Sequence, residues 1–251
     1  MSREILCLIL ARGGSKSIPR KNILPLLGKP LLAYTIDHAR ASRHITRTIV
    51  STDDPEIAEV ARAYGAEVPF LRPAEFSRDE SVDYEAFRHA LEWLRDHEGR
   101  VPEIVVQLRA TGPIRDRKII DGAIEALLAD SQADSVKSVS RPSESPFKMW
   151  RQEGNRLKPL LALEGIAEPH TLPRQRLPQV YWQNGYVDVI RSRTILDLNM
   201  MYGHEVLPFV VDEKMHELDY PSDIPVIEEL LKAHQAGVSS PSGPREEQHS
   251  V

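Results

Sequence analysis

Short apolar runs alternate with longer amphipathic segments along the first 140 residues. The run Ile5–Leu10 is continuously apolar and of strand length, which is typical of a central strand in a parallel sheet that is covered on both faces. After Pro30, apolar residues recur at helical spacing and predict a helix. Further strands are expected at 48–51, 68–71, 104–108 and 135–139, with helices at 55–64, 84–95 and 116–129. We expect Thr52 or Asp53 to cap the helix that begins near residue 55.

This alternation predicts an α/β fold with a doubly wound, mostly parallel sheet. In such sheets ligands bind at the carboxyl ends of the strands, which is where loops rich in polar residues fall. The pattern breaks over 141–182, where prolines stand at 142, 146, 159, 169, 173 and 178, so we expect an irregular arm that mediates dimer contacts. Strands at 186–190 and 206–211 and a helix at 223–234 follow.

The chain is therefore interpreted as one domain over 1–236 that includes the arm, followed by a disordered tail at 237–251. The formal net charge of -5 disfavours a nucleic-acid partner and favours a small one. No apolar stretch approaches the ~20 residues of a membrane span, and no signal-peptide pattern opens the sequence, so a cytoplasmic location is expected. The single cysteine, Cys7, lies within the first apolar run and is interpreted as a small hydrophobic residue.

The loop after the first strand concentrates positive charge beside glycines. Arg12, Lys16, Arg20 and Lys21 fall within ten positions, next to Gly13 and Gly14. Glycines let backbone N–H groups approach an anion closely, and the cations offset the charge of a phosphate ester. The loop matches neither a Walker motif nor a dinucleotide fingerprint, and a solvated basic turn is the alternative interpretation.

Two carboxylates in the segment Glu217-Leu218-Asp219 form a second candidate feature. On an extended segment, residues two apart point to the same side of the chain. Such a pair can hold Mg2+ together with phosphate oxygens. A capping and solvation role is the alternative. Asp223 is assigned a structural role in the first turn of the last helix.

The segment 10–22, Leu-Ala-Arg-Gly-Gly-Ser-Lys-Ser-Ile-Pro-Arg-Lys-Asn, resembles the nucleotide-binding signature of the acylneuraminate cytidylyltransferases (CMP-sialic acid synthetases), including members acting on legionaminic acid. Weaker matches follow in the same order at 28–31, 51–54, 70–73, 109–115, 174–178, 184–185 and 217–219. The resemblance covers about residues 3–235. It implies a Rossmann-like, GT-A-like nucleotidyltransferase fold that uses CTP, a sugar acid and Mg2+ and works as a homodimer.

The resemblance also implies roles for individual residues. Nucleotide contacts would come from Arg12, Gly13, Gly14, Ser15, Lys16, Lys21, Asn22, Arg72 and Ser81, and metal contacts from Glu217 and Asp219. Arg12, Lys21 and Asp219 would serve catalysis, with Lys21 stabilising charge at the α-phosphate. The family normally has Asp-x-Asp at the metal site, so Glu217 is a departure. Asn22 could instead be a turn residue, and Arg72 a surface cation before a proline.

The sugar side departs from the family at two positions. Arg109 stands where sialic-acid-using members commonly have glutamine, and Gly112 replaces a usual serine. Arg109 can grip a carboxylate or bridge hydroxyls, so the acid need not be N-acetylneuraminic acid. The remaining sugar-binding candidates are Thr111 and, from the arm, Lys148, Arg174 and Gln175, which in relatives complete the neighbouring subunit's site.

The implied reaction is attack of the anomeric hydroxyl of a 2-keto-3-deoxy sugar acid on the α-phosphorus of CTP, with release of pyrophosphate. Two alternatives remain open at this point. One is nucleotidyl transfer to a different acid, a phosphonate or a sugar phosphate. The other is a noncatalytic dimeric module that binds nucleotide only for regulation or scaffolding.

Overall fold

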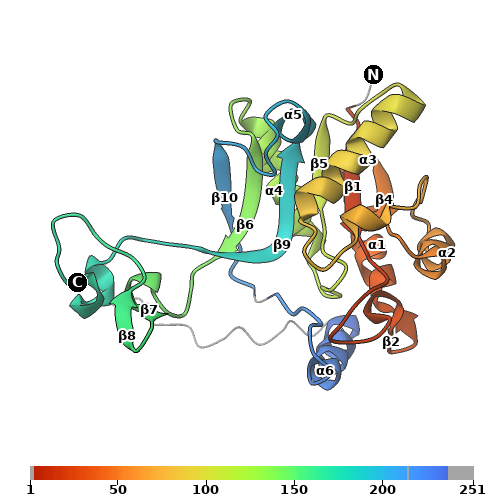
Figure 1. Cartoon of the computed structure of the whole chain (residues 1–251). Helices are drawn as coiled ribbons and strands as arrows, with labels where there is room; N and C mark the ends of the chain where they lie inside the picture. Colours follow the sequence, from red (N-terminus) through yellow and green to blue (C-terminus); the bar gives the residue numbers. More distant parts are fainter. Residues whose placement is uncertain (1–2, 214, 237–251) are drawn as a thin grey trace.

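A six-stranded sheet forms the centre of the molecule in the computed structural model, which describes residues 3–213 and 215–236 (Figure 1). Its strand order is β10-β6-β9-β5-β1-β4. The strands are β1 (Ile5–Leu10), β4 (Arg47–Ser51), β5 (Ile104–Gln107), β6 (Ser135–Ser140), β9 (Trp182–Arg191) and β10 (Val206–Val210). Only β9 runs antiparallel to its neighbours β5 and β6. The doubly wound, mostly parallel sheet is thereby confirmed.

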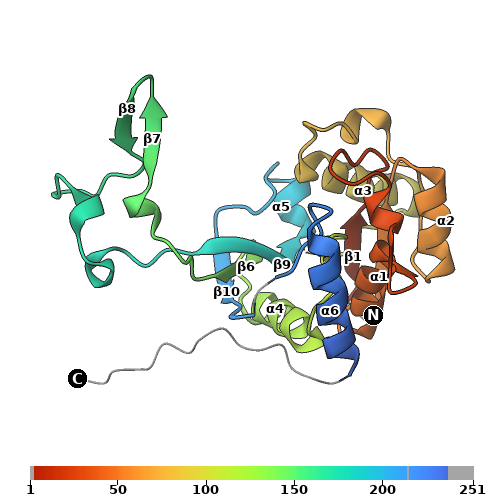
Figure 2. The ribbon, with the colours of Figure 1, turned by 90° about the horizontal axis from the view of Figure 1, so that it is seen from below.

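Helices cover both faces of this sheet. One face carries α1 (Leu31–Ala41), α2 (Pro55–Ala63) and α4 (Arg117–Ala129), and the other carries α3 (Asp83–Glu98) and α5 (Ser192–Leu196). The last helix, α6 (Asp223–Gln235), packs beside α1 and the short hairpin of β2 (Pro25–Leu26) and β3 (Lys29–Pro30) (Figure 2). Polar loops are left at the carboxyl ends of β1 and β5.

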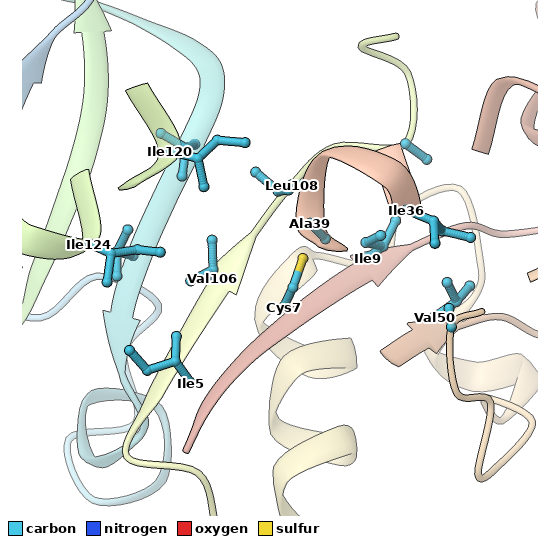
Figure 3. Close-up of a cluster of buried hydrophobic side chains, with 14 of the residues drawn as sticks. Ile5, Cys7, Ile9, Ile36, Ala39, Val50, Val106, Leu108, Ile120 and Ile124 are labelled. Atoms are coloured by element: carbon cyan, nitrogen blue, oxygen red, sulfur yellow. The ribbon is translucent and has the colours of Figure 1, made fainter. Parts of the chain in front are cut away.

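The core on the α1 and α4 face contains Cys7 among aliphatic side chains such as Ile36 and Val106 (Figure 3). Burial raises the pKa of the Cys7 thiol to about 12. The thiolate, which is the reactive form of cysteine, is therefore disfavoured at neutral pH. The interpretation of Cys7 as a hydrophobic core residue is confirmed.

Two local predictions are wrong. The expected strand at 68–71 is only a single parallel bridge between Ile49 and Glu67, because Pro69 has no N–H with which to continue the ladder. The cap of α2 is Asp54 rather than Thr52 or Asp53, since its carboxylate accepts from the backbone N–H groups of Glu56 and Ile57.

The arm leaves the sheet after β6 and returns at β9, where Ser140 pairs with Trp182. It contains the hairpin of β7 (Trp150–Glu153) and β8 (Arg156–Pro159) and the short 3-10 helices Pro146–Lys148, Pro169–Thr171 and Arg174–Arg176. Both views show the hairpin well away from the sheet (Figures 1 and 2). The expected tail at 237–251 lies outside the described residues. Within the described part of the chain, no helix has the length and apolar character needed to cross a bilayer.

Candidate active site

A cavity of about 460 Å³ opens at the carboxyl ends of β1 and β5. Three segments line it: the loop at 11–22 that follows β1, the segment 72–83, and the end of β5 with the loop 109–112. The cavity brings together nine of the residues singled out from the sequence: Arg12, Ser15, Lys16, Lys21, Asn22, Arg72, Ser81, Arg109 and Thr111. The cavity thus lies at the edge of the sheet where the sequence predicts the site.

The 11–22 loop is held against the turn between β4 and α2. The backbone N–H of Gly13 donates to Asp53 Oδ1 at 2.9 Å, and Asn22 Nδ2 donates to the carbonyl of Arg12 at 2.9 Å. A Cβ atom on Gly13 would lie 2.6 Å from Asp54 Oδ2, so a larger residue would push the loop away from this turn. On Gly14, a Cβ would meet nothing within 4 Å.

The cations of this loop pair with carboxylates from different parts of the chain. Arg12 Nη1 lies 2.9 Å from Asp79 Oδ1, and Lys16 pairs with the other oxygen of the same carboxylate. Arg20 instead pairs with Asp54 and Glu56 at the start of α2 and does not line the cavity. Counting Arg20 among the phosphate-neutralising cations was therefore wrong, because two local carboxylates hold it.

Lys21 connects the basic loop after β1 with the carboxylate segment at 217–219. Its side chain is only 14% exposed, and Nζ lies 3.1 Å from Asp219 Oδ1. The first basic loop and the carboxylate segment thus meet at the cavity although 198 positions separate them. Sequence spacing alone could not show this contact.

Asn22 and Arg72 are both buried, at 7% and 6% exposure. The interpretation of Arg72 as a surface cation is therefore wrong. Burial lowers the pKa of Arg72, and the nearby charges of Asp53 and Asp83 partly oppose that shift. Arg72 Nε donates to Ser77 Oγ at 2.9 Å, which fixes the guanidinium at the cavity wall.

Ser81 shapes the loop that closes this side of the cavity. Its hydroxyl donates to the carbonyl of Glu75 and accepts from the backbone N–H of Arg78, each at 3.1 Å. Asp79, which lies between these contacts, was not singled out from the sequence. Nothing in the sequence around Asp79 indicates that its carboxylate lies against Arg12.

The 109–112 loop contacts the carboxylate segment. Thr111 Oγ1 donates to Glu217 Oε1 at 3.0 Å, and the backbone N–H of Leu218 donates to the carbonyl of Thr111 at 2.9 Å. Leu218 is fully buried in the cluster around α1 and α6. Because neighbouring side chains alternate on an extended segment, Glu217 and Asp219 both lie on the side opposite this core.

Gly112 has no room for a side chain. A Cβ atom there would lie 1.9 Å from Met215 Cε and 2.9 Å from Arg115 Nη2. The place that a serine hydroxyl would take is thus filled by a methionine methyl group. The glycine at position 112 is therefore matched to the close approach of Met215, which the sequence alone could not show.

Three polar side chains that sequence reasoning missed lie in a row across the sheet. Asp188 on β9 is opposite Gln107 on β5 and Lys137 on β6. Lys137 Nζ lies 3.2 Å from Asp188 Oδ2, and Gln107 Nε2 donates to Asp83 Oδ2 at 2.7 Å. A sequence signal exists for each residue alone, since Lys137 and Asp188 are charged residues within strands, and largely buried charges occur preferentially at functional sites.

The arm residues stand apart from this cavity within one subunit. Arg174 and Gln175 line a separate cavity of about 210 Å³ together with Arg141 and Ser145. Arg174 Nη2 donates to the carbonyl of Pro142 at 3.0 Å. Lys148 ends a 3-10 helix of the arm. Their expected role in a neighbouring subunit's site stays a prediction.

Comparison with known proteins places the chain by fold and by sequence. The solved structure of CMP:2-keto-3-deoxy-manno-octonic acid synthetase complexed with CTP superimposes with a TM-score of 0.68 at 15% identity, over 92% of this chain and 99% of that one. This likeness shows that the two chains share a fold. A family model described as "Cytidylyltransferase" matches residues 6–158.

Two relatives from Campylobacter jejuni narrow the comparison. Its pseudaminic acid cytidylyltransferase is 43% identical over 123 residues, which are 49% of this chain and 53% of the relative, so the match spans about half of that protein. Its CMP-N,N'-diacetyllegionaminic acid synthase is 30% identical over 229 residues, which are 91% of this chain and 95% of the relative. The chain belongs to the cytidylyltransferase family, and the resemblance read from its motifs is confirmed.

Proposed function

We propose that this protein joins CMP from CTP to the anomeric hydroxyl of a sialic-acid-like nonulosonic acid and releases pyrophosphate. The observation that carries the proposal is the ion pair between Lys21 and Asp219, which brings the carboxylate segment against a basic loop that lines the cavity. The named activities of the relatives, CMP-legionaminic acid synthase and pseudaminic acid cytidylyltransferase, support the substrate class.

The nucleotide half of the site comprises the 11–22 loop and the segment 72–83. Arg12, Lys16 and Lys21 supply positive charge for a triphosphate, and a partly buried cation such as Lys21 acts more strongly than one in water. Arg72 and Asn22 reach the cavity from its buried side, where they are suited to a nucleobase with its own donors and acceptors. Catalysis rests on alignment of the reacting groups and neutralisation of charge.

The acceptor half comprises Arg109, Thr111 and the row that contains Gln107. Arg109 is loosely placed, with Nη2 at 3.8 Å from Asp83 Oδ2, so its guanidinium is available to a carboxylate or hydroxyl.

Lys148, Arg174 and Gln175 are proposed to enter this half from the arm of a second subunit. Exposed apolar side chains along the arm support a homodimer: Met149, Trp150, Leu157, Leu160, Tyr181 and Trp182. A cytoplasmic location stays a prediction.

Glu217 and Asp219 are proposed to hold Mg2+. The donor set fits, because both are carboxylates that contact cavity-lining residues, Glu217 through Thr111 and Asp219 through Lys21, and Asp219 is 56% exposed. The described residues contain no group of three or more His, Cys, Asp or Glu side chains arranged to hold a metal ion, but Mg2+ at phosphate-binding sites needs only one or two carboxylates. When bound, the ion supplies charge neutralisation on the phosphates.

The test is pyrophosphate release from CTP, measured against a panel of nonulosonic acids with Mg2+ present. We expect turnover with at least one legionaminic- or pseudaminic-type acid and a preference for CTP over ATP and GTP. A preference for ATP or GTP would overturn the cytidine assignment. Binding of CTP without pyrophosphate release from any acid would favour the noncatalytic module instead.

A further inference from the structure

Arg115 is a charged side chain that the proposed chemistry does not use, and it is only 2% exposed. All of its hydrogen-bond partners are neutral. Nε donates to the carbonyl of Tyr186 at 2.9 Å and Nη2 to that of Arg109 at 2.8 Å. Nη1 donates to the carbonyl of Gly112 and to Thr35 Oγ1 at 3.3 Å. Among residues 3–213 and 215–236, no salt bridge to Arg115 is found within 4 Å.

These partners come from three separate parts of the fold. Thr35 lies on α1, Tyr186 lies on β9, and the carbonyls of Arg109 and Gly112 mark the two ends of the 109–112 loop. Thr35 Oγ1 also donates to the carbonyl of Arg109 at 3.2 Å. Arg115 therefore holds both ends of the loop while its middle, with Thr111, lines the cavity.

The same contacts extend to the carboxylate segment through Thr111, which binds Glu217 by its side chain and Leu218 by its carbonyl. The nucleotide half does not depend on Arg115. Its 11–22 loop is held by the contact of Gly13 with Asp53 and by that of Asn22 with Arg12. A change at Arg115 should therefore separate the two halves of the site.

Arginine is the residue that this arrangement requires. Its planar fork presents five N–H donors in several directions, whereas a lysine has three donors on one atom. Lysine could keep the charge but could not reach the carbonyls of Tyr186, Arg109 and Gly112 together. Burial lowers the pKa of Arg115 to about 10, so the guanidinium still carries its charge at neutral pH.

We propose that Arg115 is the positioning residue of the acceptor half, which fixes the 109–112 loop so that Arg109 and Thr111 meet the sugar acid. This inference rests on the proposed function for the identity of the acceptor. It assigns Arg115 no contact with substrate.

The experiment compares Arg115→Lys with Arg191→Lys in steady-state pyrophosphate release. Arg191 is a matched control, because it also binds backbone carbonyls, those of Ala133 and Leu127 at 2.9 Å, and lies outside the cavity. For Arg115→Lys we expect kcat/KM for the acid to fall by roughly 100-fold, as small misplacements of a binding group can cost that much. The KM for CTP should stay within about twofold. For Arg191→Lys both KM values should stay at the wild-type level.

A second measurement tests the loop itself and does not need turnover. In hydrogen–deuterium exchange, Arg115→Lys should speed exchange in the peptide that contains Gly112 and in the one that contains Leu218, while residues 12–22 exchange as in the wild type. If the wild type turned over no acid, the proposed function would fail and this measurement would still decide the positioning role. Unchanged exchange in the peptide that contains Gly112 would overturn the inference. So would an equal loss of turnover in Arg115→Lys and Arg191→Lys with no change in the KM for the acid.

Discussion

Arg12 Nη1 lies 2.9 Å from Asp79 Oδ1, so a carboxylate of the chain itself occupies part of the cation cluster that we assign to the triphosphate. Lys16 pairs with the same carboxylate. A triphosphate that binds Arg12 and Lys16 must compete with Asp79 for these cations.

Asp79→Asn should therefore lower the KM for CTP by about two- to fivefold, the range expected for removing a competing exposed ion pair. The effect should shrink as salt screens the charges. Steady-state kinetics at low and high ionic strength measure it. Glu80→Gln is the control, because Glu80 does not line the cavity. A raised KM in Asp79→Asn would instead give Asp79 a supporting role in nucleotide binding.

Lys21→Ala should lower kcat by roughly 100- to 1,000-fold, as expected when a preorganised charge at the reacting phosphate is lost. The fold should persist, since Lys21 is a cavity side chain rather than part of the apolar core. Circular dichroism and pyrophosphate release measure the two effects, with Lys118→Ala as an exposed control outside the cavity. Near-normal turnover would remove Lys21 from the phosphates.

Asp219→Asn should raise the Mg2+ concentration needed for half-maximal activity by about tenfold or more. Asp96→Asn is the control, because Asp96 is exposed on α3 and does not line the cavity, so its Mg2+ titration should match that of the wild type. Identical titrations for the wild type and Asp219→Asn would refute the metal assignment.

Leu157→Asp should dissociate the proposed dimer, because this arm side chain is 63% exposed and lies on β8. Sedimentation velocity measures the change. Val226→Asp is the matched control, since Val226 is 53% exposed on α6 and should leave the assembly intact. A monomeric wild type would contradict the proposal outright.

Mixing two inactive variants tests whether the arm completes the partner's site. Lys21→Ala damages the body of a subunit, and Arg174→Ala damages its arm. After subunit exchange, one site of each mixed dimer has both parts intact, so activity should return to about a quarter of the wild-type rate. Recovery would be absent if Arg174 served its own subunit.

Asp54→Ala should destabilise the fold by about 1 kcal/mol, a typical loss for an N-cap. The hydrogen bond from Arg20 is the main cause that holds the pKa of Asp54 below its ordinary value. The stability that Asp54 provides should therefore be complete above about pH 4 and be lost as the pH falls through the folded-state pKa. Urea unfolding across this range should show the difference from wild type shrinking in acid, with Glu59→Ala, on the exposed side of the same helix, as the control.

The succession of strands and helices along the chain could be predicted from the sequence, because strands such as β1 are continuously apolar and the helices each have an apolar stripe. The antiparallel direction of β9 could not, since direction depends on how the arm returns the chain to the sheet. Pro69 accounts for the absence of the expected strand at 68–71, because the apolar residues around it favour a strand but the proline has no N–H to donate.

The candidate site was also predictable only in part. Arg12, Lys21 and Asn22 belong to one continuous motif, so local sequence was enough to predict that they lie together. The buried row that contains Lys137 and Asp188 is assembled from separate strands by sheet register. The periodicity of one strand shows which residues share a face, but it does not show which strands are neighbours. The grouping of these residues into one row could therefore be found only from the fold.

The pairing of Ser140 with Trp182 has a consequence for how this protein can change over time. The arm departs and returns at one rung of the sheet, so its length and contacts can vary at small cost in loop-closure entropy and without shifting the register of other strands. Sequence changes confined to the arm could thus alter together the acceptor contacts and the subunit contacts that we propose for it. The nucleotide half of the site would stay the same.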